Sequence, residues 1–220
     1  MEARIREKGL IFNSEMVRAI LDGRKTQTRR PIKWKQTRFT EIGEREDGSK
    51  WPWSEDAEHA CDFWHPCPFG AVGDRIWVRE AFRVHSRATD VATLVYKASE
   101  RNSWTEQTRR VPVAVCNKPA TPEKWTPSLH MPRWASRILL EITGVRVERL
   151  NSISQEDAQA EGLELTGWRP TYSDPDSGGE VMTPYDNFAE LWSSIYGEES
   201  WNANPWVWVI EFKRVEGGAA

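Results

Sequence analysis

Apolar residues recur at the three- and four-residue spacing of a helix in three separate stretches of the chain. The first two stretches begin at polar residues that can cap a helix, and all three end before a glycine, which can leave a helix in a left-handed conformation. The first predicted helix covers residues 14–22 and ends before Gly23. The second is a short segment that begins at Ser154 and ends at Gly162. The third runs from Phe188 to Ile195 and ends before Gly197.

Elsewhere apolar and polar residues alternate, which is typical of strands with one buried face. One of these stretches contains Gly144, where a β-bulge would fit. The predicted strands are Arg75–Glu80, Ala92–Ala98, Arg137–Leu150 and Trp206–Val215.

Three further regions, residues 33–73, 99–130 and 167–183, show no sustained period and are rich in polar residues, proline and glycine. Such stretches predict long loop insertions. The chain has no internal repeat and no linker between two cores, so we expect a single domain over residues 1–220. The fold class predicted is α+β, with a small mixed sheet or barrel flanked by about three helices.

Composition agrees with an ordinary globular protein of 220 residues, of which 39% are hydrophobic and 29% charged. The longest apolar run, Trp206–Ile210, is far too short to cross a bilayer, so no membrane association is expected. The beginning of the chain lacks the apolar core of a secretory signal. Three cysteines, an odd number, argue against a disulfide framework. These features favour a cytoplasmic protein.

Charge is distributed unevenly, although the net charge is only −3. Residues 24–38 contain several Lys and Arg and no acidic residue, whereas residues 151–200 are distinctly acidic. A local basic patch on a mildly acidic protein suits a small anionic ligand or a nucleotide better than a long duplex.

The basic patch begins with Gly23–Arg30, which has four cations and two hydroxyls in eight residues. Such a segment can hold a phosphate-bearing ligand, or it can lower the pKa of Lys25. A neutral Lys25 could then take the hydroxyl proton of Thr28, three positions further on, if the chain turns between them. From the residues alone, a plain basic loop that binds phosphate or solvent remains an equal alternative.

Two glutamates, Glu161 and Glu80, are candidates for pairing with a cation. Glu161 ends the short second helix, where its carboxylate can project beside a turn, although a solvated surface position is the commoner fate of glutamate. Glu80 and Arg79 point to opposite faces of a predicted strand, so one of them faces inward and needs a partner. We expect Glu80 to be half buried and paired with a cation.

A metal site is considered because His59, Cys61, His65 and Cys67 lie within nine residues. Zinc ligands usually come in CxxC or HxxxH pairs, and this spacing matches neither. We therefore expect no metal ligands and no cofactor.

The chain resembles the ASCH superfamily, whose members share a PUA-like fold, a small β-barrel with helices packed around it. The resemblance is carried by ILDGRKTQTR ending at Arg29, by SxEDAxAEG ending at Gly162, and by the final strand WVIEFK ending at Lys213. Three blocks resemble the longer, phage-associated branch of this superfamily: Gly73–Glu80, His130–Arg137 and Asn204–Trp208.

Small bacterial members of the superfamily are amidohydrolases that remove the acyl group from N4-acetylcytidine and related N4-acylated cytosines. The resemblance implies the same metal-free reaction here, with a modified cytidine as a small-molecule substrate. Its proposed triad corresponds to Lys25 as base, Thr28 as nucleophile, and Glu161, which positions Lys25 or serves the proton transfers. The three insertions have no counterpart in the small enzymes, so the acyl-group preference does not carry over.

Four further residues are expected to contact the substrate. Arg29 or nearby backbone N–H groups would stabilise the oxyanion, Trp77 or Trp206 would wall the pocket, and Glu80 would complete it. The alternative function is an RNA-binding or RNA-cleaving PUA-like module, because residues 24–38 are basic. The net negative charge favours the small substrate over RNA.

Overall fold

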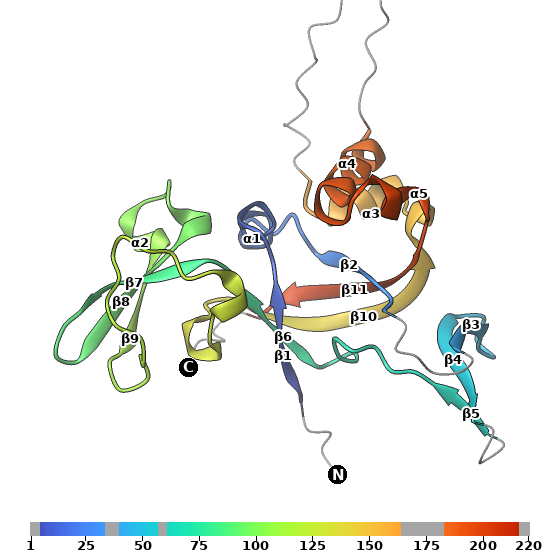
Figure 1. Ribbon diagram of the computed structural model, residues 1–220, viewed down its shortest axis with the longest axis horizontal. Helices are drawn as coiled ribbons and strands as arrows, with labels where there is room; N and C mark the ends of the chain where they lie inside the picture. Colours follow the sequence, from blue (N-terminus) through green and yellow to red (C-terminus); the bar gives the residue numbers. More distant parts are fainter. Residues whose placement is uncertain (1–4, 34–39, 57–60, 164–182, 216–220) are drawn as a thin grey trace, which may run out of the picture. The chain divides into compact units, whose positions relative to one another are not determined.

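The computed structural model describes residues 5–33, 40–56, 61–163 and 183–215 (Figure 1). Its chain forms two compact units, each assembled from separate segments. Unit 1 comprises Met1–Gly23, Val72–Ile142 and Lys213–Ala220, and unit 2 comprises Arg24–Ala71 and Thr143–Phe212. The prediction of one domain over the whole chain stays a prediction.

The described part of unit 1 contains two groups of strands and two α-helices. Strand β1 (Glu7–Ile11) pairs in parallel with β6 (Arg75–Arg79), which pairs antiparallel with the beginning of β10 (Leu139–Arg149). The helices are α1 (Ser14–Leu21) and α2 (Trp104–Gln107). A second, antiparallel sheet consists of β7 (Phe82–Arg87), β8 (Val91–Tyr96) and β9 (Thr108–Pro112), and the short 3-10 helices of the unit are Lys97–Ser99, Ser128–His130 and Arg133–Ala135.

One buried apolar cluster of unit 1 forms on one face of the β7–β8–β9 sheet. Alternate residues of β7 and β8 point to this face, which is why Phe82, Val84, Leu94 and Tyr96 are buried together. Met131 packs against the same cluster.

In its described residues, unit 2 contains strands, three α-helices and a small separate sheet. Strand β11 (Trp206–Arg214) pairs antiparallel with β2 (Gln27–Pro31) and lies beside the second part of β10. The helices α3 (Gln155–Ala160), α4 (Pro184–Tyr196) and α5 (Glu198–Asn202) lie together (Figure 1). The separate antiparallel sheet consists of β3 (Thr40–Glu44), β4 (Lys50–Asp56) and β5 (Cys61–Trp64), and a 3-10 helix covers Leu150–Ser152.

Apolar residues of β11 hold the helices of unit 2 against the sheet. Val207 and Val209, two residues apart, point to the same face and pack with Ala158 of α3 and with Phe188 and Trp192 of α4. Because Arg29 of β2 lies opposite Val209 in the strand pairing, its side chain faces the same helices.

The structure confirms the α+β class, the three predicted helices and the four predicted strands, with small shifts at their ends. The strand around Gly144 is continuous. Among the described strands no sheet closes into a barrel. The PUA-like class therefore remains an expectation.

Two of the predicted loop insertions contain regular secondary structure, which the sequence pattern did not predict. Residues 33–73 contain the β3–β4–β5 sheet, and residues 99–130 contain α2 and β9. Their strands carry tryptophan, arginine and proline in place of a simple apolar alternation, which explains why the pattern did not reveal them. The third predicted insertion, residues 167–183, lies outside the described residues except for its last position.

Candidate active site

The basic segment after Gly23 is held against the C-terminal end of α3. Gly23 has a φ of 76°, so the chain leaves α1 through the left-handed conformation that glycine permits. Further on, Thr26 donates its backbone N–H to the Ala160 carbonyl at 2.9 Å, and Lys25 forms an isolated β-bridge with Glu161. The Arg24 guanidinium adds a 2.8 Å hydrogen bond to the Gly162 carbonyl.

Lys25 and Glu161 form a buried ion pair. The Lys25 amine donates to Glu161 Oε2 at 2.6 Å and to the Glu161 backbone carbonyl at 2.8 Å. The two side chains are only 2% and 4% exposed, so this glutamate is not a solvated surface residue. Two of the three triad positions that the resemblance implies therefore touch each other, although 136 positions separate them in sequence.

Burial lowers the pKa of Lys25 below its ordinary value of 10.5, because water no longer stabilises the ammonium. Glu161 opposes this shift, whereas the positive charges of Arg30 and Arg29 add to it. A neutral amine has two N–H donors and one lone pair. The two observed hydrogen bonds to Glu161 use two N–H donors of the Lys25 nitrogen.

Arg29 is fully buried and directed at carboxylates. Its Nη1 donates to Glu161 Oε1 at 3.2 Å and its Nη2 to Asp157 Oδ2 at 2.7 Å. The guanidinium also lies 5.9 Å from the centre of the Phe188 ring. The Arg29 side chain is 0% exposed, and its guanidinium is paired with Glu161 in this structure.

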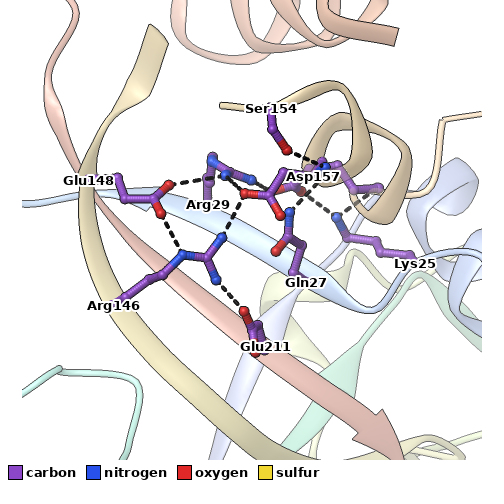
Figure 2. Close-up of polar contacts among 9 residues, drawn as sticks. Lys25, Gln27, Arg29, Arg146, Glu148, Ser154, Asp157 and Glu211 are labelled. Carbon is purple, nitrogen blue, oxygen red and sulfur yellow. Dashed lines mark hydrogen bonds and ion pairs between the residues drawn. The ribbon is translucent and has the colours of Figure 1, made fainter. Parts of the chain in front are cut away.

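A chain of ion pairs continues from Arg29 toward the surface (Figure 2). Asp157 Oδ2 accepts a second hydrogen bond from Arg146 Nη2 at 2.6 Å, and Arg146 also pairs with Glu148 and Glu211. Sequence reasoning missed these four residues. The available signals were the position of Asp157 four residues before Glu161 and the alternation of Arg146 and Glu148 on one strand face.

Thr28 lies on the opposite face of β2 from Arg29, because adjacent strand residues point in opposite directions. It is paired with Ile210, and the residue is 4% exposed. Both Lys25 and Thr28 are in the described part of the chain, and no hydrogen bond joins them. The structure thus brings Lys25 and Glu161 together but does not bring Thr28 to the amine.

The remaining predicted contact residues have other partners in the structure. Trp206 begins β11, and the Arg149 guanidinium stacks 4.4 Å from the centre of its ring. Trp77 belongs to unit 1, where it covers Gly9 of the neighbouring strand β1.

Glu80 also belongs to unit 1, and it is fully buried where half burial was expected. Both of its carboxylate oxygens accept hydrogen bonds from Arg137, at 2.9 and 3.0 Å, which confirms the predicted cation partner. Burial raises the pKa of Glu80, and Arg137 opposes that shift. Both oxygens are therefore committed to a structural ion pair in this structure.

Two of the four candidate zinc ligands have described side chains with other contacts. His65 Nε2 is 2.9 Å from Ser54 Oγ, and the Cys67 side chain is buried. Across the described residues, no group of three His, Cys, Asp or Glu is arranged to hold a metal ion. None of the described helices has the length and apolar character needed to cross a membrane.

Comparisons of the chain with protein-family models, with curated proteins and with solved structures found no match. The resemblance to the ASCH superfamily rests on the motifs quoted above.

Proposed function

We propose that this protein is a metal-free amidohydrolase that removes acyl groups from N4-acylated cytosine nucleosides. The observation that carries the proposal is the buried contact between Lys25 and Glu161, at 2.6 Å, within the segment that resembles the ASCH amidohydrolases. Burial lowers the pKa of Lys25, which favours the neutral amine that a general base requires. A PUA-like fold and a cytoplasmic location belong to the same proposal.

In the proposed reaction, the Thr28 hydroxyl oxygen attacks the acyl carbonyl while Lys25 takes its proton. The C–N bond then breaks, the proton passes from Lys25 to the cytosine N4 amine, and the acyl group remains as an ester on Thr28. Water, deprotonated by Lys25, hydrolyses that ester and returns the free hydroxyl. Glu161 holds the amine in place throughout.

Substrate binding must change the geometry before this reaction can begin. Thr28 lies on the other face of β2 from Arg29, and the Lys25 and Glu161 side chains are almost fully covered. Catalytic hydrogen bonds are often completed only when substrate is bound. We therefore propose that the nucleoside opens the segment around Lys25 and brings the hydroxyl to the amine.

The first test is the hydrolysis of N4-acetylcytidine by Lys25→Met, which keeps a side chain of similar length but removes the base. We expect kcat to fall by about 100-fold or more. Lys33→Ala is the matched control, because it removes an exposed lysine of the same basic segment and should retain full activity. Undiminished turnover by the Lys25 variant would exclude the proposed mechanism.

Thr28 provides the second arm of the test. Thr28→Ser keeps a hydroxyl, whereas Thr28→Val has nearly the same shape without one. We expect the serine variant to retain measurable deacylation and the valine variant to lose it. Equal activity of the two variants would show that Thr28 is not the nucleophile.

One observation favours the alternative of RNA binding. In the β3–β4–β5 sheet, Trp51, Trp53 and Trp64 share one face, because Trp53 pairs with Trp64 and lies two residues from Trp51. The Arg45 guanidinium lies 4.1 Å from the centre of the Trp51 ring. Half-buried aromatic rings beside a cation can stack with unpaired bases.

RNA binding would appear as an affinity for a single-stranded oligonucleotide that falls steeply as salt increases. Replacing Trp53 with Ala should weaken this binding if the sheet is the contact surface. No measurable binding at low salt would remove the alternative, and cleaved products would identify a nuclease.

A further inference from the structure

We propose that Asp157 is a positioning residue, which acts through Arg29 to hold the Glu161 carboxylate on the Lys25 amine. This inference rests on the proposed function, because it assigns a supporting role in the same candidate site. It differs from the sequence-based expectation, in which Arg29 contacts the reacting substrate.

The first step of the argument is the placement of Arg29 across one turn of α3. Asp157 and Glu161 are four residues apart, so their side chains project from the same side of the helical segment. Arg29 reaches both of them, at 2.7 and 3.2 Å, and its side chain has no exposed surface. A guanidinium held at both ends in this way fixes one carboxylate relative to the other.

The second step is that Asp157 is itself held from several directions (Figure 2). Its backbone N–H donates to Ser154 Oγ at 3.1 Å, and its carbonyl accepts a hydrogen bond from Gln27 Nε2 at 2.8 Å. The carboxylate receives Arg146 in addition to Arg29. These contacts hold the Asp157 carboxylate in place, and that carboxylate in turn fixes the position of the Arg29 guanidinium.

Third, β2 and the residues before it direct alternate side chains toward α3. Lys25 donates to Glu161, Gln27 to the Asp157 carbonyl, and Arg29 to both carboxylates. Three residues at alternate positions thus contact two residues one helical turn apart. Asp157→Asn removes the charge that anchors Arg29 Nη2, and the remaining carboxylate contacts of Arg29, to Glu161 at 3.2 Å and to Glu148 at 3.3 Å, are both longer.

The test compares Asp157→Asn with Glu156→Gln. Glu156 is the adjacent, exposed residue of α3, so its variant removes the same charge without touching Arg29. With N4-acetylcytidine as substrate, we expect Asp157→Asn to lower kcat by roughly 10- to 100-fold. Its KM should stay within about twofold of the unaltered protein, since Asp157 does not touch the nucleoside.

A titration of the lysine side chains by NMR gives a readout that does not depend on activity. Loss of Asp157 removes a negative charge and loosens Glu161, so the pKa of Lys25 should fall further. The Glu156 variant should leave the Lys25 titration unchanged. If Asp157→Asn matches Glu156→Gln in both kcat and titration, the inference is overturned.

Two further outcomes are distinguishable. If the unaltered protein hydrolyses no N4-acylated cytidine, the proposed function fails, and the Lys25 titration alone decides whether Asp157 positions Glu161. If Asp157→Asn does not fold, Asp157→Glu takes its place, because it keeps the charge and displaces the carboxylate. An unchanged kcat and Lys25 titration in the glutamate variant would also overturn the inference.

Discussion

At the scale of single residues, the Lys25–Glu161 pair is asymmetric. Glu161 forms ion pairs with two cations, Lys25 and Arg29. In the described residues, Lys25 forms an ion pair with one acid, Glu161. Removing one member of a buried pair leaves the other without compensation. The two members should therefore not contribute equally to stability.

We predict that Glu161→Gln destabilises the protein more than Lys25→Met does. The glutamine variant leaves Lys25 buried without its carboxylate and takes one of three described carboxylate partners from Arg29, which should cost about 3 kcal/mol. The methionine variant leaves Glu161 still paired with Arg29, so its cost should be smaller. Urea unfolding at pH 7 measures both, and Glu156→Gln serves as the neutral reference. The reverse order of stability would contradict this account of the pair.

Glu80 and Arg137 form a second buried pair, in unit 1. We predict that Arg137→Met destabilises the protein by about 3 kcal/mol at pH 7, because it leaves a buried carboxylate. Burial already raises the pKa of Glu80, and loss of Arg137 would raise it further. The folded variant then takes up a proton that the unfolded chain releases at its ordinary carboxyl pKa, so the cost should shrink as pH falls. A cost that does not change between pH 7 and pH 5, measured by urea unfolding, would contradict this.

At the scale of elements, periodicity located α1, α3 and α4 and the strands β6, β8, β10 and β11, because their burial depends on apolar residues. It missed β2, whose sequence QTRRP is polar although Gln27, Thr28 and Arg29 are buried. Gln27 Nε2 and Arg29 Nη2 donate hydrogen bonds to Asp157 of α3, and a pattern of hydrophobicity cannot register such contacts. Lys25 and Glu161 were identified through motifs, whereas Asp157 and Arg146 needed the fold.

Two glycines in strands offer a matched test of element packing. A Cβ on Gly9 of β1 would lie 2.5 Å from a ring carbon of Trp77, whereas one on Gly144 of β10 would meet the carboxylate end of Glu211 at 2.5 Å. A flexible carboxylate can move aside more easily than a packed indole.

We therefore predict that Gly9→Ala costs about 1 to 3 kcal/mol and that Gly144→Ala costs less. Gly144→Ala should also displace Glu211 from Arg146, an interaction at the partly exposed end of the network. Thermal unfolding of the two variants measures the difference. A larger loss for Gly144→Ala would mean that Glu211, and not Trp77, is the less movable neighbour.

At the scale of the whole molecule, the two compact units could not have been predicted from the sequence. Unit 1 takes three segments of the chain and unit 2 takes two, so neither corresponds to a continuous stretch. Local periodicity reports only neighbours along the chain, whereas this division depends on contacts between distant segments.

The stability of the protein should depend on pH through Lys25. The unfolded chain keeps this lysine protonated up to about its ordinary pKa of 10.5, while the folded state releases the proton at lower pH. In that interval the unfolded state binds more protons, so the free energy of unfolding rises with pH. We predict that the stability difference between the unaltered protein and Lys25→Met changes in this direction from pH 7 to pH 10. Parallel pH profiles of the two proteins, measured by urea unfolding, would show that Lys25 does not titrate differently in the two states.

The 136-residue separation between Lys25 and Glu161 also has a consequence for refolding. Local helices can form within microseconds, but a contact between such distant segments must first overcome the entropy of closing a long loop. Lys25 also has to lose its hydration shell when the contact forms. During refolding from urea, helical circular dichroism should therefore recover before deacylation activity, and activity would report the final ordering of this contact.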